Sequence, residues 1–111
     1  MVSRYVPEEG DIVWLEFDPQ AGHEQAGHRP AVVLSRKAYN RKTGLAIFCP
    51  ISSRVKGYPF EVNVKGQKIQ GAALSDQVKS LDWKARRAKL IEKLDEKSLA
   101  EVIAKLSSII Q

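Results

Sequence analysis

Short apolar runs separated by turn-forming residues make up most of this chain, and they limit its possible fold more than any other feature. Runs rich in β-branched and aromatic residues are typical of strands, and the proline, glycine and polar residues between them are typical of turns. None of the runs is long enough to cross a membrane as a helix. We therefore expect strands over residues 11–17, 29–35, 45–51, 58–64, 71–78 and 87–91.

Two stretches carry helix signals instead. Ser35 is a suitable N-cap for a short helix that runs through Lys42, and Gly44 follows its end. A second helix can start at Asp95, or at Ser98 as part of a capping box. Its apolar residues recur every three or four positions, on one face: Leu99, Val102, Ile103, Leu106, Ile109 and Ile110. The sequence thus predicts a mostly β fold, a small antiparallel barrel or strongly curved sheet whose apolar surface is covered by a C-terminal helix.

The length of 111 residues is typical of one domain with its own core, so we expect a single domain over residues 1–111. The first residues lack the apolar stretch of a secretory signal. With Cys49 as the only cysteine, a disulfide framework is excluded, and with only His23 and His28 beside it a zinc cluster is not expected. These features favour a metal-free protein of the reducing cytoplasm.

The positive charge is concentrated in the middle of the chain. The net charge is +5, but residues 29–89 alone hold fourteen Lys and Arg against Glu61, Asp76 and Asp82. Such a segment attracts polyanions: nucleic acid, an acidic protein segment or a membrane surface. It also fits a face that serves only solubility, so charge alone leaves these alternatives open.

A polar loop bracketed by Gly22 and Gly27 leads into Arg29 at the start of an expected strand. An arginine on a rigid element can bind phosphate oxygens through two hydrogen bonds and keeps its charge at any physiological pH. A structural salt bridge between Arg29 and Glu24 explains the same pattern equally well.

Two further loops carry candidate binding groups. Residues 50–59 combine paired hydroxyls, two cations and an aromatic ring, which suits phosphate binding and base stacking. Residues 74–80 offer hydrogen bonds to base edges and one cation. Each loop alone also fits an ordinary polar turn. The side chains concerned are Ser52, Ser53, Arg54, Lys56, Tyr58 and Phe60 near the first loop, and Asp76, Gln77 and Lys79 in the second.

Taken together, five segments resemble the MazF/PemK family of toxin endoribonucleases, in order and with similar spacing. They are GDIVW at 10–14, FDP at 17–19, EQAGHRPAVVLS at 24–35, KGYPFEV at 56–62 and DQVKS at 76–80. The resemblance implies an SH3-like antiparallel barrel of the PemK/CcdB type that works as a homodimer. It implies metal-independent, sequence-specific cleavage of single-stranded RNA, leaving 2′,3′-cyclic phosphate and 5′-hydroxyl ends. It also implies a MazE-like antitoxin whose acidic tail blocks the RNA channel.

The resemblance assigns roles to individual residues. It places the catalytic arginine at Arg29 and the catalytic hydroxyl at Ser52, where related proteins commonly have threonine, with Ser53 as a helper. Asp76 matches a position of second-rank catalytic importance. His28 is a further second-rank candidate for a different reason, because it stands beside Arg29. The positions matched to the RNA path are Glu24, Lys56, Gln77, Lys79 and Arg86.

This chemistry is physically coherent because RNA carries its own nucleophile, the 2′-hydroxyl beside the scissile phosphate. An enzyme has to align that hydroxyl, stabilise the charge on the phosphate and help move protons. Two alternatives belong to other classes: a nucleic-acid-binding barrel without catalysis, and a gyrase poison like CcdB. The group formed by Arg29, Ser52, Lys56 and Lys79 favours RNA cleavage.

Overall fold

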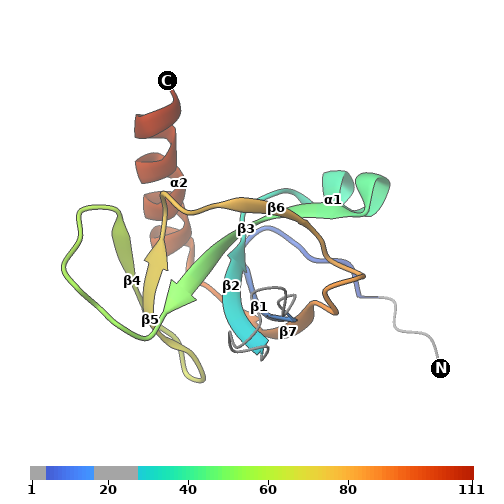
Figure 1. The fold of residues 1–111 in the computed structure, drawn as a ribbon, viewed down its shortest axis with the longest axis horizontal. Coiled ribbons are helices and arrows are strands. Elements are labelled where there is room, and N and C mark those ends of the chain that lie inside the picture. The colour runs from blue at the N-terminus through green and yellow to red at the C-terminus, as the bar shows by residue number, and fades with distance from the viewer. Residues whose placement is uncertain (1–4, 17–27) are drawn as a thin grey trace, which may run out of the picture.

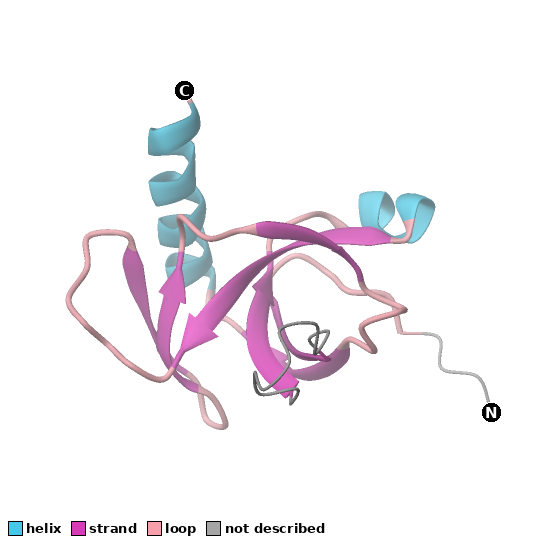
Figure 2. Cartoon of the chain, viewed as in Figure 1, coloured by secondary structure: helices cyan, strands magenta, loops and turns pink. Residues whose placement is uncertain are grey.

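A curled antiparallel sheet forms the centre of the molecule in the computed structural model, which describes residues 5–16 and 28–111 (Figure 1). The strand order is β4-β5-β3-β2-β1-β7, and β6 pairs with β3 beside this path. The strands are β1 (Asp11–Glu16), β2 (His28–Val33), β3 (Leu45–Ser52), β4 (Glu61–Lys65), β5 (Gln70–Leu74), β6 (Lys79–Asp82) and β7 (Lys89–Lys93). The helices are α1 (Lys37–Thr43) and α2 (Glu96–Ile110), which lie well apart at different ends of the sheet (Figure 2). In the described part of the chain, neither helix has the length and apolar content that a membrane span requires.

The long strand β3 joins the two parts of the sheet. Its middle pairs with β2, with Ala31 opposite Pro50, and its end pairs with β5, with Ser52 opposite Ala72. Antiparallel pairing advances one residue on each strand in opposite directions. Continuing the β2–β3 register past Ala31 therefore brings Arg29 to the level of Ser52, so the start of β2 and the end of β3 share one corner of the sheet.

The core lies on both faces of the central strands. Neighbouring residues of one strand point to opposite faces, so Ile12 and Val32 join one apolar cluster while Val13 and Val33 join the other. The first cluster also holds the apolar face of α2, including the fully buried Val102. Burial on both faces explains why these strands read as continuous apolar runs.

Several element boundaries differ from the sequence-based expectations. The single strand expected over 71–78 is wrong: β5 ends at Leu74, and a turn closed by a hydrogen bond from Gln77 N–H to the Leu74 carbonyl separates it from β6. The expected strand 58–64 begins only at Glu61, because the Glu61 N–H first closes a turn onto the Tyr58 carbonyl. The last strand is shifted from 87–91 to 89–93.

Two of the helix-capping predictions are confirmed and one is wrong. Asp95 caps α2 as expected, since its carboxylate accepts a hydrogen bond from Ser98 N–H at 3.0 Å. Gly44 ends α1 in the left-handed conformation, at φ 76°. Ser35 is not the cap of α1, because Arg36 occupies that position without a side-chain cap. The Ser35 hydroxyl instead donates to the Asn40 side-chain oxygen and accepts from Ile47 N–H.

Candidate active site

A cleft of about 680 Å³ opens at the corner where β2 starts and β3 ends. Five of the residues singled out in the sequence line it together: Arg29, Ser52, Ser53, Arg54 and Gln77. They come from segments far apart in the chain, and the register of β2, β3 and β5 brings them to one place. The prediction that Arg29 and Ser52 act at one site is consistent with this arrangement.

The charge of the cleft has a single sign among the residues described as lining it. Arg29, Arg54 and Lys68 are the charged ones, and no Asp or Glu stands with them. Arginine remains protonated in proteins, and exposed lysine is protonated at neutral pH. The cleft is therefore suited to an anion such as a phosphodiester, and a bound phosphate meets no carboxylate from the part of the lining that the structure describes.

Arg29 is held by strand pairing rather than by a loop. It is the second residue of β2, its partner in the β1 ladder is Leu15, and its side chain is exposed at the cleft. Groups on paired strands are positioned more accurately than groups on loops, which favours a role in stabilising a developing charge.

The Ser52 hydroxyl belongs to a tight local turn. Its Oγ accepts a hydrogen bond from Arg54 N–H at 3.1 Å, and the hydroxyl can donate to the Arg54 carbonyl at 3.3 Å. This turn fixes the side chain at the end of β3, half-buried at the cleft wall, while Ser53 is exposed. One lone pair of the Ser52 oxygen accepts the Arg54 N–H, and the hydroxyl keeps a second lone pair and its O–H for a phosphate.

Gly71 allows β5 to approach the Ser52 backbone. A Cβ atom added at Gly71 would lie 2.2 Å from the Ser52 carbonyl oxygen. The backbone at Gly71 has φ 153°, a conformation that residues other than glycine rarely adopt. The glycine therefore sets the separation of the two strands next to the candidate catalytic hydroxyl.

Asp76 is not among the residues that line this cleft, and its carboxylate binds Tyr58. One Asp76 oxygen accepts a hydrogen bond from the Tyr58 hydroxyl at 2.6 Å, and that bond raises the pKa of Tyr58. The other oxygen is buried without a hydrogen-bond partner among the described residues. Asp76 is thus a neighbour of the cleft residue Gln77 but not itself part of the lining.

The remaining candidates lie around the cleft or outside the description. The exposed Lys56 donates its backbone N–H to the Glu61 carboxylate at 3.2 Å, and the exposed Lys79 pairs with Phe48 in the β3–β6 ladder. Arg86 is half-buried, and its carbonyl accepts from Glu16 N–H at 2.8 Å. Glu24 lies outside the described residues, as does the side chain of His28, the first residue of β2.

The structure adds cleft residues that the sequence analysis did not single out as site candidates: Trp14, Lys68 and Gln70. Trp14 lies in a strand pattern typical of core residues, Lys68 belongs to the turn between β4 and β5, and Gln70 is the first residue of β5 after that turn. The segment KGQKIQG, residues 65–71, contains two lysines and two glycines, which is a signal for an exposed basic turn. Nothing local in that segment indicates that the turn reaches Arg29.

Cys49 is close to Ser52 in the chain but is no candidate nucleophile. It is buried in the core, and burial raises its pKa to about 12. The thiolate is the reactive form, so this thiol is inert at neutral pH. No group of three or more His, Cys, Asp or Glu in residues 5–16 and 28–111 is arranged to hold a metal ion.

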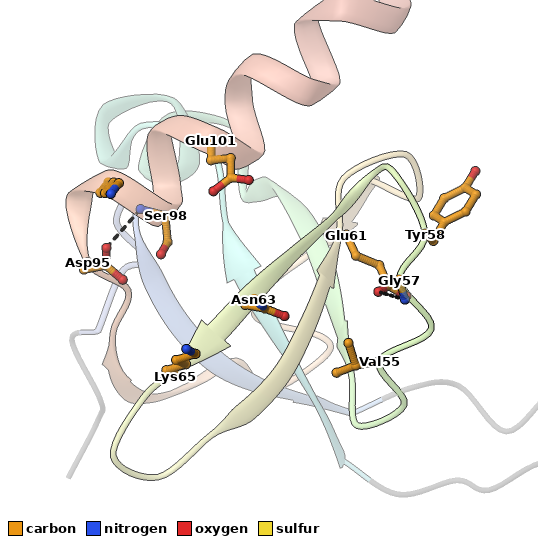
Figure 3. A pocket seen from close by; sticks show the side chains of 10 residues that line it. Val55, Gly57, Tyr58, Glu61, Asn63, Lys65, Asp95, Ser98 and Glu101 are labelled. Carbon is orange, nitrogen blue, oxygen red and sulfur yellow. Dashed lines mark hydrogen bonds between the residues drawn. The ribbon is translucent and has the colours of Figure 1, made fainter.

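A second cleft, of about 480 Å³, lies between β4 and the start of α2 (Figure 3). Its lining mixes the acids Glu61, Asp95 and Glu101 with Lys65 and Lys97. The Glu61 carboxylate is turned toward the loop before β4, where it accepts from Gly57 N–H at 3.0 Å. Because of these carboxylates, this cleft is a poorer place for a polyanion than the one at Arg29.

Comparison with known proteins agrees with this picture. A family model described as PemK-like, MazF-like toxin of type II toxin–antitoxin system matches residues 8–110. Endoribonuclease toxin MazF of Escherichia coli K12 is 60% identical over 88 residues, covering 79% of each chain. Endoribonuclease PemK of Escherichia coli is 35% identical over 108 residues, covering 93% of this chain and 81% of the relative.

Solved structures extend the likeness to the fold. The MazF chain in a MazE–MazF crystal structure from Deinococcus radiodurans superposes with a TM-score of 0.90 at 52% identity, covering 96% of both chains. A mycobacterial endoribonuclease crystallised with its cognate antitoxin has a TM-score of 0.75 at 16% identity, covering 92% of both chains, which supports the fold alone. The expected barrel-like antiparallel fold with a C-terminal helix is confirmed, and the readings as a non-catalytic module or a gyrase poison are set aside. The chain belongs to the PemK/MazF family and is an endoribonuclease toxin of a type II toxin–antitoxin system.

Proposed function

We propose that this toxin cleaves single-stranded mRNA at specific sequences, without a metal ion, by attack of the substrate's own 2′-hydroxyl on the adjacent phosphate. The products are a 2′,3′-cyclic phosphate and a 5′-hydroxyl end, and the loss of mRNA arrests translation and growth in the cytoplasm. The observation that carries this proposal is the cleft that joins Arg29 and Ser52, where the described lining residues include cations and no carboxylate.

Each catalytic role follows from where charge develops. As the 2′-oxygen attacks, negative charge grows on the non-bridging phosphate oxygens, and the Arg29 guanidinium can bind two of them at once. The Ser52 hydroxyl donates a further hydrogen bond, and Ser53 supplies a second hydroxyl at the same cleft wall. His28 and Asp76 are the second-rank candidates for proton transfer, because Arg29 stays protonated and cannot act as the base.

The RNA strand is proposed to extend from the cleft over the cationic surface around it. Gln77 in the cleft offers an amide to base edges, since amides can donate and accept together. The exposed Lys56 and Lys79 suit phosphate contacts. Arg86 and Glu24 complete the residues assigned to RNA binding.

A substrate that lacks one hydroxyl tests the nucleophile. An RNA oligonucleotide with 2′-deoxyribose only before the scissile bond should bind normally, resist cleavage and act as a competitive inhibitor. Cleavage of this oligonucleotide at the normal rate would refute attack by the 2′-hydroxyl. End-mapping of fragments from a long RNA reports the cleavage sequence and the product ends in the same experiment.

Two variants test the assigned catalytic groups. Arg29→Ala should lose about 3–4 kcal/mol of transition-state stabilisation, which is several hundredfold in rate. Arg41→Ala is the matched control, because Arg41 is exposed on α1, away from the cleft. Ser52→Ala should lose less if Ser53 substitutes for it, and the double variant should then lose more than the sum of the two.

We further propose a MazE-like acidic antitoxin as the partner and a homodimer as the active form. Related MazF chains from Deinococcus radiodurans were crystallised with MazE, and the cationic cleft suits an acidic peptide. The exposed Ile109 and Ile110 at the end of α2 provide apolar surface for self-association. Light scattering at micromolar concentration should report a dimer, and calorimetry should show that antitoxin and RNA compete. A fully active monomer, or a ternary complex at full affinity, would contradict these two proposals.

A further inference from the structure

A carboxylate from the last strand holds the turn between β4 and β5. Glu92 in β7 accepts hydrogen bonds from three consecutive backbone N–H groups: Gln67 at 3.0 Å, Lys68 at 2.9 Å and Ile69 at 2.8 Å. The strand order places β4–β5 and β7 at opposite ends of the sheet, so this contact joins the two ends of the curled sheet. It spans more than twenty residues of sequence, and no strand pairing supports it.

The turn is shaped to receive this carboxylate. A Cβ atom at Gly66 would lie 2.4 Å from a Glu92 oxygen, so the glycine leaves the space that the carboxylate occupies. The Gly66 N–H also closes the turn onto the Ile69 carbonyl at 2.9 Å. Partial desolvation raises the pKa of Glu92, but the three N–H donors and the Lys68 charge lower it further, so the net pKa lies below its ordinary value. The carboxylate is therefore ionised, the form that accepts these hydrogen bonds best.

The same turn forms one wall of the cleft. Lys68, Ile69 and Gln70 line it together with Arg29 and Ser52. A lysine ammonium is a donor to RNA phosphate, and a glutamine amide binds base edges or sugar hydroxyls. Lys68 lies in the turn and Gln70 is the first residue of β5 directly after it, so the places of both side chains depend on the turn. Glu92 fixes the backbone N–H of Lys68 itself.

We propose that Glu92 is a positioning residue for RNA: by holding the turn at residues 66–69, it keeps Lys68 and Gln70 where they contact the substrate strand in the cleft. This inference rests on the proposed function, since it assumes that RNA occupies the cleft. It adds Lys68 and Gln70 as substrate contacts and assigns Glu92 a role although its carboxylate touches no RNA.

Glu92→Gln is the direct test. Its effect on the Kd for RNA has one sign if Glu92 positions the turn and the opposite sign if Glu92 acts only through its charge. Glutamine can offer its carbonyl oxygen to the turn, but its NH₂ group then faces at least one N–H donor, so the turn loosens. If the turn positions RNA contacts, the Kd for the uncleavable 2′-deoxy oligonucleotide should rise about tenfold. If Glu92 acts only through its charge, removing a negative charge near RNA should instead lower the Kd.

Glu96→Gln is the matched control. It makes the same chemical change at an exposed site in the first turn of α2, outside the residues that line the cleft. Its Kd should equal that of the unchanged chain or fall slightly. The single-turnover rate at saturating RNA should stay within about twofold in Glu92→Gln, because lost binding that is common to substrate and transition state raises KM without changing kcat.

Lys68→Ala and Gln70→Ala test the inference without disturbing the carboxylate, since alanine keeps the backbone N–H. Each should weaken binding of the oligonucleotide, and Glu92→Gln should add little in the Lys68→Ala, Gln70→Ala background. Unchanged affinity in the Lys68→Ala, Gln70→Ala protein overturns the inference, even if Glu92→Gln does not fold. An unchanged or lower Kd in folded Glu92→Gln also overturns it. If the unchanged chain binds RNA but does not cut it, the proposed function fails while this inference is still judged by binding.

Discussion

Replacing Gly71 by alanine should damage the proposed active site from the neighbouring strand. The added Cβ would lie 2.2 Å from the Ser52 carbonyl oxygen and 3.1 Å from the Ser52 carbonyl carbon, whereas ordinary contacts begin at 3.4 Å. Both atoms of the clash belong to backbone, so no flexible side chain can move aside. The end of β3 and β5 must therefore separate by about 1 Å, and Ser52 moves with its strand.

The magnitude can be estimated from two contributions. Alanine at the φ of Gly71 is strained, which costs about 1 kcal/mol or more, and overpacking of a tight backbone contact costs about 1–3 kcal/mol. We expect a loss of about 3 kcal/mol in the free energy of unfolding. A displacement of about 1 Å at a catalytic group lowers the cleavage rate about a hundredfold.

The assay compares Gly71→Ala with Gly44→Ala. Gly44 also has a positive φ, 76°, but a Cβ there meets nothing within 4 Å, so this control carries the backbone strain without the clash. Thermal unfolding by circular dichroism gives the stability of each protein, and RNA cleavage is measured well below both melting temperatures. Gly44→Ala should lose about 1 kcal/mol and keep its activity. If Gly71→Ala cleaves RNA as fast as Gly44→Ala, then the contact with Ser52 does not position the site as argued.

Three further predictions concern the core, acid pH and metal. The buried Asn40 side chain donates hydrogen bonds to the Pro7 and Ser35 carbonyls at 2.8 and 3.1 Å. Asn40→Asp replaces this donor by an acceptor and should lose about 3 kcal/mol of stability, while the exposed control Asn63→Asp should lose almost none. Equal melting temperatures of the two variants would contradict this. The pKa of Glu92 is lower in the folded chain than its ordinary 4.5, so the stability from its hydrogen bonds is present above pH 4.5 and lost as pH falls through the folded pKa. NMR titration of the turn amides should show this loss, and amide signals that stay unchanged below the folded pKa would contradict it. Cleavage should be unchanged in excess EDTA, since no described residues form a metal-binding group, and activity that EDTA abolishes and Mg²⁺ restores would refute the mechanism.

Sequence patterns predicted the features that depend on neighbouring residues. The apolar periodicity and Asp95 marked α2, because a helix face and an N-cap are defined within a few positions of the chain. The apolar runs rich in β-branched and aromatic residues predicted the central strands β1, β2 and β3. The break between β5 and β6 was missed, because Val78 follows the polar turn at Ser75–Gln77 and made the whole stretch resemble one strand.

The candidate site was predictable only in part. The residues that were missed are those whose place depends on contacts between segments far apart in the chain. The family resemblance brought Arg29, Ser52 and Gln77 to one site, and the cleft contains all three. It also suggested Asp76, whose carboxylate is bound to Tyr58 instead of lining the cleft. No pattern indicated Lys68, because its place in the cleft depends on Glu92 in the last strand.

The sequence by itself determined the two helices, the strands other than the division between β5 and β6, the capping of α2, the cationic middle of the chain and the family. These depend on local backbone preference, on periodicity and on composition, which are properties of neighbouring residues. Only the tertiary structure decided which cations share the cleft, how closely Gly71 approaches Ser52 and where the turn at residues 66–69 lies. Those depend on strand register and on hydrogen bonds between residues far apart in the chain, and the bond from Ile69 N–H to the Glu92 carboxylate exists only once the sheet has curled to bring its two ends together.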